Sequence, residues 1–136
     1  MIGIDTNVLL RLLLQDDATQ ARQVRSQIEA AEASGVPIFI NDIVLCETLW
    51  TLRARFASDK DELVATLRGL LAVASFAFES RDTLQRTLAT FERSTAGFSD
   101  CLIAAKNVAT GCGHTATLDR AMGDLPGVKL LSGRRQ

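Results

Sequence analysis

The chain has 136 residues, a formal net charge of −1, 47% hydrophobic residues and 23% charged residues. This length suits one domain that can bury about two thirds of its surface, so the chain needs no disulfide or metal to fold, and its composition excludes a disordered protein. Its apolar runs are too short to span a membrane and its first residues lack the basic segment of a signal peptide, so we expect a cytoplasmic protein.

The first half of the chain alternates short apolar runs with longer segments of helical period. Asp16 and Asp17 precede an amphipathic segment that Gly35 ends, and Asn41 and Asp42 can cap the helix that follows the next apolar run. In chain order we predict a strand at 2–5, helices at 8–14 and 16–34, a strand at 37–40 and a helix from 41 to about 56.

The second half continues the same alternation. The spacing of Ser58 and Asp61 resembles a capping box, and Gly111 follows the last long helical segment. We predict a helix at 60–71, a strand at 76–78, a helix ending near 94, a helix at 100–110, a strand at 114–118, one more helix, and a strand at 128–131.

This order predicts the α/β class, as a three-layer α/β/α sandwich with a central, mainly parallel sheet of about five strands. Residues 1–132 are expected to form this single domain, and residues 133–136 to form a C-terminal tail.

Four acidic residues stand in apolar surroundings. Asp5 and Asp119 directly follow two predicted strands, and ligands of parallel α/β sheets bind at the carboxyl ends of the strands. Glu47 lies among apolar residues of one predicted helix and Asp100 opens another, and helices that follow strands begin at that same edge. The four carboxylates can therefore converge, although each alone also suits a helix cap, a turn or a solvent-facing position.

Four carboxylates at one place repel each other and raise each other's pKa values, which a bound divalent cation relieves. A site made only of oxygen ligands favours Mg²⁺ or Mn²⁺ over zinc. The three cysteines, Cys46, Cys101 and Cys112, are scattered without a C-x-x-C motif, which favours small buried side chains in a reducing compartment. The single histidine, His114, cannot build a metal site of its own.

Four segments carry a family resemblance: Asp5-Thr6-Asn7, Cys46-Glu47-Thr48-Leu49-Trp50, the run from Phe98 to Ala104, and Thr117-Leu118-Asp119. In this order and at these separations they resemble the PIN domain, and within it the VapC-type toxins of type II toxin–antitoxin modules. The resemblance covers nearly the whole chain.

The resemblance implies a Mg²⁺- or Mn²⁺-dependent endoribonuclease. The carboxylates that would hold the metal and direct the attacking water are Asp5, Glu47, Asp100 and Asp119. Thr6, Asn7 and Thr117 match polar positions that support those carboxylates or the water. The expected reaction hydrolyses a phosphodiester bond of a structured RNA, such as a transfer RNA, and leaves a 5′-phosphate and a 3′-hydroxyl.

The resemblance also implies partners. They are a second copy in a homodimer, a VapB-like antitoxin that inhibits the enzyme, and operator DNA bound only through the antitoxin. Trp50 and Phe56 suit the groove that would hold the antitoxin, and a core position for Trp50 is the alternative.

The near-zero net charge does not exclude a nucleic-acid substrate, because 12 of the 15 basic residues are arginines, which suit phosphate contacts. The candidates for such contacts, or alternatively for solvated helix faces, are Arg11, Arg53, Arg55, Arg81 and Arg120, and Arg120 adjoins Asp119.

Two other functions compete with the nuclease. A haloacid-dehalogenase-like phosphatase also begins with an aspartate after its first strand, but it needs a second aspartate where Asn7 stands. A response-regulator receiver domain fits no better, because the paired acids and a late lysine are missing. A PIN-like domain that only binds RNA or acts as a scaffold is the other alternative, and a metal-dependent cleavage assay separates it from the nuclease.

Overall fold

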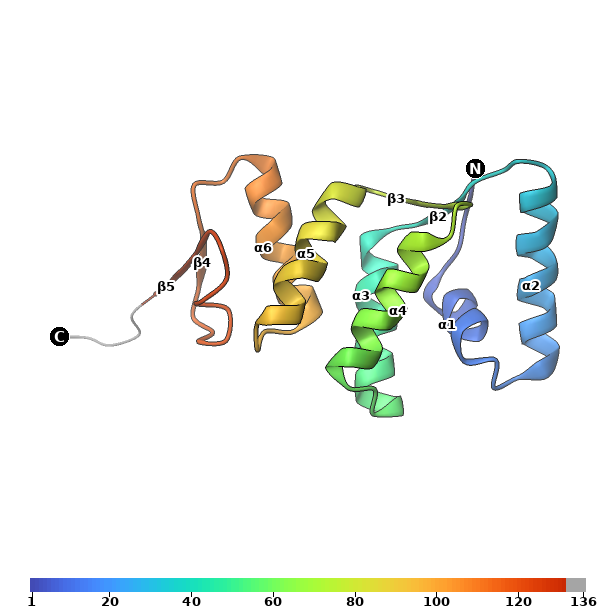
Figure 1. Ribbon diagram of the computed structural model, residues 1–136, viewed down its shortest axis with the longest axis horizontal. Helices are drawn as coiled ribbons and strands as arrows, with labels where there is room; N and C mark the ends of the chain where they lie inside the picture. Colours follow the sequence, from blue (N-terminus) through green and yellow to red (C-terminus); the bar gives the residue numbers. More distant parts are fainter. Residues whose placement is uncertain (132–136) are drawn as a thin grey trace. The chain divides into compact units, whose positions relative to one another are not determined.

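The computed structural model describes residues 1–131, and the predicted tail at 133–136 lies outside them. The chain divides into two compact units (Figure 1). We call Met1–Glu79 the N-terminal unit and the part from Ser80 onward the C-terminal unit, and we describe each by itself. Within the described residues, no helix combines the length and the apolar character needed to cross a membrane.

The N-terminal unit is a parallel sheet with four helices. Its strands lie in the order β1-β2-β3, with Ile2 opposite Ile38 and Ile38 opposite Phe76. Helix α1 packs against α2 and α3, and α3 packs against α4. In chain order the elements are β1 (Ile2–Gly3), α1 (Thr6–Leu14), α2 (Ala18–Ala33), β2 (Ile38–Ile40), α3 (Asp42–Phe56), α4 (Lys60–Ala72) and β3 (Phe76–Phe78).

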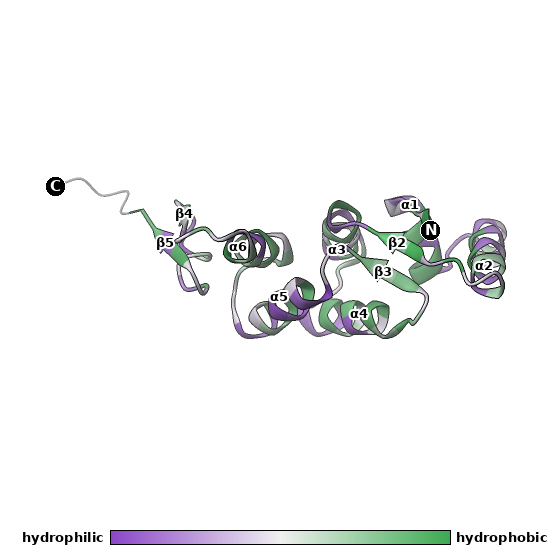
Figure 2. Ribbon diagram, turned by 90° about the horizontal axis from the view of Figure 1, so that it is seen from above, coloured by the Kyte–Doolittle hydropathy of each residue, from purple (hydrophilic) through white to green (hydrophobic). Residues whose placement is uncertain are grey.

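The core of this unit forms around the central strand. Ile38 and Ile40 are fully buried, and because side chains alternate along a strand, both lie on the same face of β2. Figure 2 shows the strands of this sheet as hydrophobic, with the helices around them. The fully buried leucines of the helices are Leu9, Leu45, Leu49 and Leu67. Burying each such side chain contributes about 1.5–3 kcal/mol.

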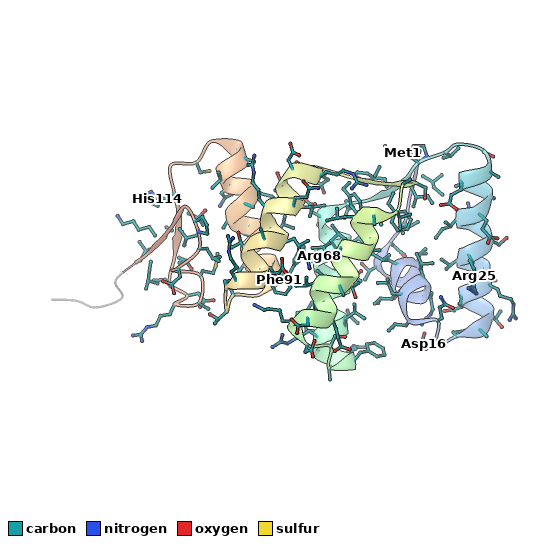
Figure 3. All side chains as sticks on the ribbon, viewed as in Figure 1. Met1, Asp16, Arg25, Arg68, Phe91 and His114 are labelled. Carbon is teal, nitrogen blue, oxygen red and sulfur yellow. The ribbon has the colours of Figure 1, made fainter. Side chains whose placement is uncertain are left out.

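The C-terminal unit consists of α5 (Arg81–Arg93), α6 (Phe98–Thr110), β4 (Thr115–Thr117) and β5 (Val128–Leu130). Helices α5 and α6 pack closely along each other. The rings of Phe91, which Figure 3 labels on α5, and Phe98 meet edge to face at 5.9 Å between their centres. Strands β4 and β5 are parallel, with Thr115 opposite Val128.

Two predictions about the strands are corrected. The sheet of the N-terminal unit has three strands rather than about five, and β4 and β5 form a separate parallel pair. Apolar runs indicate how many strands there are, but a strand of two or three residues carries too little information to say which strand it pairs with. The helix predicted between the last two strands is also absent, and residues 120–127 form turns instead. Gly123, Pro126 and Gly127 interrupt this segment, so it cannot continue as a helix.

The helix caps agree with the sequence in one case and differ in another. The Asn41 side chain caps α3 by accepting from the Val44 N–H at 2.9 Å, as predicted. The capping box of α4 consists of Asp59 and Glu62, one residue later than the predicted Ser58 and Asp61. Both pairs have the required spacing, but the longer Glu62 side chain reaches back to the Asp59 N–H at 2.9 Å.

None of the three cysteines, all of which lie in the described part of the chain, forms a disulfide bond. Cys101 is buried as predicted, whereas Cys112 is exposed and Cys46 is partly exposed. Cys112 follows the left-handed Gly111 that ends α6, so it lies in the surface turn before β4.

Candidate metal centre

Asp5 is held by the start of the first helix. It lies two residues after β1 and caps α1, with its Oδ1 accepting from the Val8 N–H at 3.0 Å. Among residues 1–131 its second oxygen, Oδ2, has no hydrogen-bond partner. The cap function proposed as an alternative is therefore present, and it orients the carboxylate while it leaves one oxygen for a ligand.

Glu47 lies beside the segment that carries Asp5. The hydroxyl of Thr6, the first residue of α1, donates to Glu47 Oε1 at 2.5 Å. Glu47 is exposed on α3, so this hydrogen bond orients a side chain that would otherwise move freely in solvent. Asn7 is exposed and lines the same cavity as Asp5.

The C-terminal unit holds the other two carboxylates. Burial, followed by the charge of Asp119, raises the pKa of Asp100, so the two acids interact. Asp100 is the third residue of α6, and the helix is capped by Gly97, so the alternative that Asp100 is a helix cap is wrong.

The segment after β4 fixes Asp119 through two backbone contacts. Its N–H donates to Thr117 Oγ1 at 3.0 Å, and its Oδ1 accepts from the Ala121 N–H at 2.9 Å. Thr117 therefore contacts the backbone of the acid. Asp119 Oδ2 has no hydrogen-bond partner in the described part of the chain, so it is open to a ligand, as Asp5 Oδ2 is.

The structure thus forms two pairs of acids, one in each unit. Asp5 and Glu47 belong to the N-terminal unit, and Asp100 and Asp119 belong to the C-terminal unit. For residues 1–131, neither unit by itself gathers three His, Cys, Asp or Glu side chains closely enough to hold a metal ion. The convergence of all four acids remains a prediction.

Glu79 is a further acid at a strand end, and it was not among the residues predicted from the sequence. It directly follows β3, and its Oε2 accepts from the Asp42 N–H at 2.8 Å at the start of α3. The signal was available, because Glu79 follows a predicted strand in the same way as Asp5 and Asp119. Its contact with a helix N-terminus gives it a structural role in joining β3 to α3.

A cavity of about 690 Å³ lies beside Asp5 in the N-terminal unit. Its walls come from β1, α1 and α2. Within the described residues, Asp5 and Arg11 are the only charged residues that line it, and the other polar lining residues are the amides Asn7, Gln20, Gln23 and Gln27.

The face of α3 that carries Glu47 also exposes large apolar side chains. Ile43 and Trp50, four residues before and three residues after Glu47, are 68% and 64% exposed. Phe56 near the end of the helix is 47% exposed. Trp50 therefore does not belong to the core of the N-terminal unit, which was one of the two positions considered for it.

Comparison with known proteins identifies the family. Residues 2–128 match the PIN domain, so the match extends over the described parts of both units. No curated protein sequence matches the chain. PIN domains are a nuclease-type family, generally metal-dependent, and the match confirms the predicted α/β fold class with parallel strands. Because the match covers far more than half of its length, the chain belongs to the PIN domain family.

Proposed function

We propose that the protein is a Mg²⁺- or Mn²⁺-dependent endoribonuclease that acts as the toxin of a VapBC-type toxin–antitoxin module. One observation carries the proposal. Each unit presents an acid after the carboxyl end of its first parallel strand, Asp5 or Asp119, together with a second acid on a neighbouring helix. In parallel α/β folds this edge is where ligands bind.

The donor set fits a hard divalent cation. In this proposal Asp5, Asp100 and Asp119 hold the ion, with Glu47 beside it. Asp5 and Asp119 each have one carboxylate oxygen engaged by a backbone N–H and one oxygen without a hydrogen-bond partner in the part of the chain that the structure describes. Burial, followed by the charge of Asp119, raises the pKa of Asp100, and a cation at the same place would favour its charged form.

The residues of the site have different roles in the proposed hydrolysis. When bound, a divalent cation lowers the pKa of water to near neutrality and offsets charge on the phosphate oxygens. Glu47, oriented by Thr6, accepts a hydrogen bond from the attacking water and places it in line with the scissile bond. Thr117 and the backbone after β4 keep Asp119 in place, so little reorganisation is needed during the reaction.

The partner proposal rests on α3. The apolar residues Ile43 and Trp50 flank Glu47 on one helix face, which suits a groove for an extended or helical antitoxin segment that also covers the acidic site. We propose a VapB-like antitoxin as this partner, a homodimer as the assembly, operator DNA bound only through the antitoxin, and a cytoplasmic location. A structured RNA such as transfer RNA is the proposed substrate, because the chain has no Tyr and a single Trp for stacking on unpaired bases.

The decisive experiment incubates the purified, antitoxin-free protein with total bacterial RNA, with and without Mg²⁺ or Mn²⁺. Asp5→Asn is the sharpest variant, because asparagine caps helices as well as aspartate does and so removes the charge but keeps the start of α1. We expect discrete fragments that require metal, and a rate at least about a hundredfold lower in Asp5→Asn and Asp100→Asn. Asp124→Asn, an exposed acid in the turn before β5, is the matched control and keeps the wild-type rate.

Two results contradict the proposal. Wild-type rates in both Asp5→Asn and Asp100→Asn would show that these carboxylates do not carry the chemistry. RNA binding without cleavage in either metal would identify a non-catalytic PIN-like RNA-binding domain instead.

A further inference from the structure

The cavity beside Asp5 has two charged residues of opposite sign. Asp5 caps the start of α1, and Arg11 lies six residues later on the same helix, roughly 9 Å along its axis. A site that cleaves a phosphodiester strand needs a carboxylate to hold the metal at the cleaved phosphate. It also needs a positively charged side chain to bind a neighbouring phosphate of the strand. The rest of the polar lining consists of uncharged amides, which do not repel a phosphate and do not neutralise the charge of the arginine.

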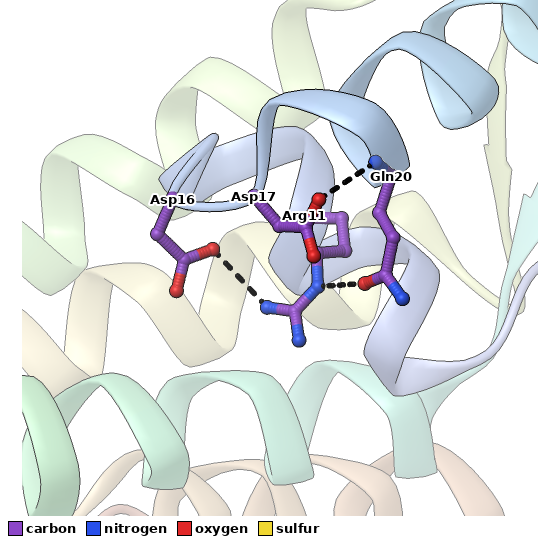
Figure 4. Close-up of polar contacts among 4 residues, drawn as sticks. All are labelled: Arg11, Asp16, Asp17 and Gln20. Carbon is purple, nitrogen blue, oxygen red and sulfur yellow. Dashed lines mark hydrogen bonds and ion pairs between the residues drawn. The ribbon is translucent and has the colours of Figure 1, made fainter.

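Two neighbours hold the Arg11 side chain in one orientation (Figure 4). Its Nε–H donates to Gln20 Oε1, and its Nη1 donates to Asp16 Oδ1 at 3.1 Å. Gln20 is itself placed by the cap of α2, where Asp17 Oδ1 accepts from the Gln20 N–H at 3.0 Å. The guanidinium is therefore fixed before any ligand arrives, which lowers the entropy cost of binding.

The guanidinium of Arg11 still has N–H donors that can bind a ligand. Its side chain is 32% exposed, and its salt bridge is to an Asp16 side chain that is 48% exposed, so solvent screens much of the mutual attraction. A guanidinium has five N–H donors, and the contacts to Gln20 and Asp16 use two of them. Within the described residues the other three have no protein acceptor, and planar forks of this kind suit phosphate oxygens.

We propose that Arg11 binds a phosphate of the RNA strand that flanks the phosphate cleaved at Asp5, with the cavity as the subsite for that flanking nucleotide. This inference rests on the proposed function, because it takes RNA as the ligand. Among the arginines of residues 1–131, it selects Arg11 because this side chain is preorganised and shares a cavity with a carboxylate of the site.

The test measures binding of a fluorescent RNA hairpin to the full chain in EDTA, where cleavage is not expected, over a range of KCl concentrations. Each lost phosphate contact lowers the magnitude of the slope of log K against log salt by about 0.7–0.9. We expect Arg11→Gln to bind about tenfold more weakly at low salt and to show this smaller slope. Arg22→Gln, which removes an exposed charge from α2, is the matched control and should keep the wild-type slope.

Two further variants separate binding from folding. Arg11→Lys keeps a cation and should keep most of the slope, while Asp16→Asn removes the partner of Arg11 and should keep the slope in full. An unchanged slope in Arg11→Gln, or a loss in Asp16→Asn equal to that in Arg11→Gln, would overturn the inference and leave Arg11 as a structural link between α1 and α2. Cleavage by the wild type with an unchanged Arg11→Gln slope refutes this inference alone. Arg11-dependent binding without cleavage in metal refutes only the nuclease.

Discussion

The hydrogen bond from Thr6 to Glu47 gives the most discriminating prediction about how the N-terminal half of the site is organised. It joins the start of α1 to α3 at 2.5 Å and so links the segments that carry Asp5 and Glu47. Thr6→Val removes the donor but keeps the shape of the side chain. Hydrogen bonds to charged groups contribute about 1.5–3 kcal/mol, and because Glu47 is exposed we expect a value below this range, about 1 kcal/mol.

Urea unfolding, combined with a double-mutant cycle, measures the free energy that the hydrogen bond between Thr6 and Glu47 contributes to stability. Thr6→Val should cost about 1 kcal/mol in the wild type and close to nothing in a Glu47→Ala background. Thr6→Ser keeps the hydroxyl and should behave like the wild type. A cost that persists in the Glu47→Ala background, with a coupling below about 0.3 kcal/mol, would refute the assignment of Thr6 as the residue that positions Glu47.

RNA cleavage provides a readout that a purely structural role would not change. If Thr6 positions Glu47, Thr6→Val slows single-turnover cleavage by about tenfold, which corresponds to the loss of one such hydrogen bond in the transition state. Thr6→Ser then restores the rate to within about twofold of the wild type. Equal losses in the valine and serine variants would show that the hydroxyl is not the group that matters.

Three further predictions concern the pH dependence and stability of the fold. Because the pKa of Asp100 is raised in the folded state, this group contributes stability below its ordinary pKa of about 3.8, and the contribution is lost as pH rises through the folded-state pKa. Metal-free Asp100→Asn should therefore unfold at a higher temperature than the wild type at pH 7 and at the same temperature near pH 3.5. A lower unfolding temperature of the variant at pH 7 would contradict this. Asp59→Ala should lose about 1 kcal/mol in urea unfolding because it removes the acceptor of the α4 capping box, while Ser58→Ala should change little. Gly127→Ala should cost about 1–3 kcal/mol, because Gly127 has a φ of +73° and a new Cβ would lie 3.0 Å from Val108 Cγ2, and Val108→Ala should relieve only the steric part.

Much of the fold was predictable because local chemistry determines it. The strand at 76–78 and the ends of the helices at 56 and 110 follow from short apolar runs, from caps and from breakers such as Gly111. The buried side of α2 was also predictable, since the amphipathic segment before Gly35 places Ala21, Val24 and Ile28 three to four residues apart, and all three are buried. Ala18, which continues this spacing toward the N-terminus, is exposed because it begins the helix.

The partners of these elements were not predictable in the same way. Two capping boxes with equal spacing compete before α4, and only the geometry of the turn selects Asp59 over Ser58. The pairing of β4 with β5, rather than membership of one larger sheet, depends on hydrogen bonds between segments that the sequence leaves unspecified.

For the candidate site, too, the sequence predicts the residues but not their orientation. From the sequence by itself, Asp5, Glu47, Asp100 and Asp119 are predicted as site residues, because each follows an apolar strand or stands in an apolar segment. Only the tertiary structure showed how the acids are held, with Thr6 donating to Glu47, Thr117 accepting from the Asp119 backbone, and burial and charge acting on Asp100. Residue type and position along an element are local properties that a sequence records. The orientation of a carboxylate depends on atoms brought together by folding, such as Thr6 and Glu47, which are 41 residues apart in the chain.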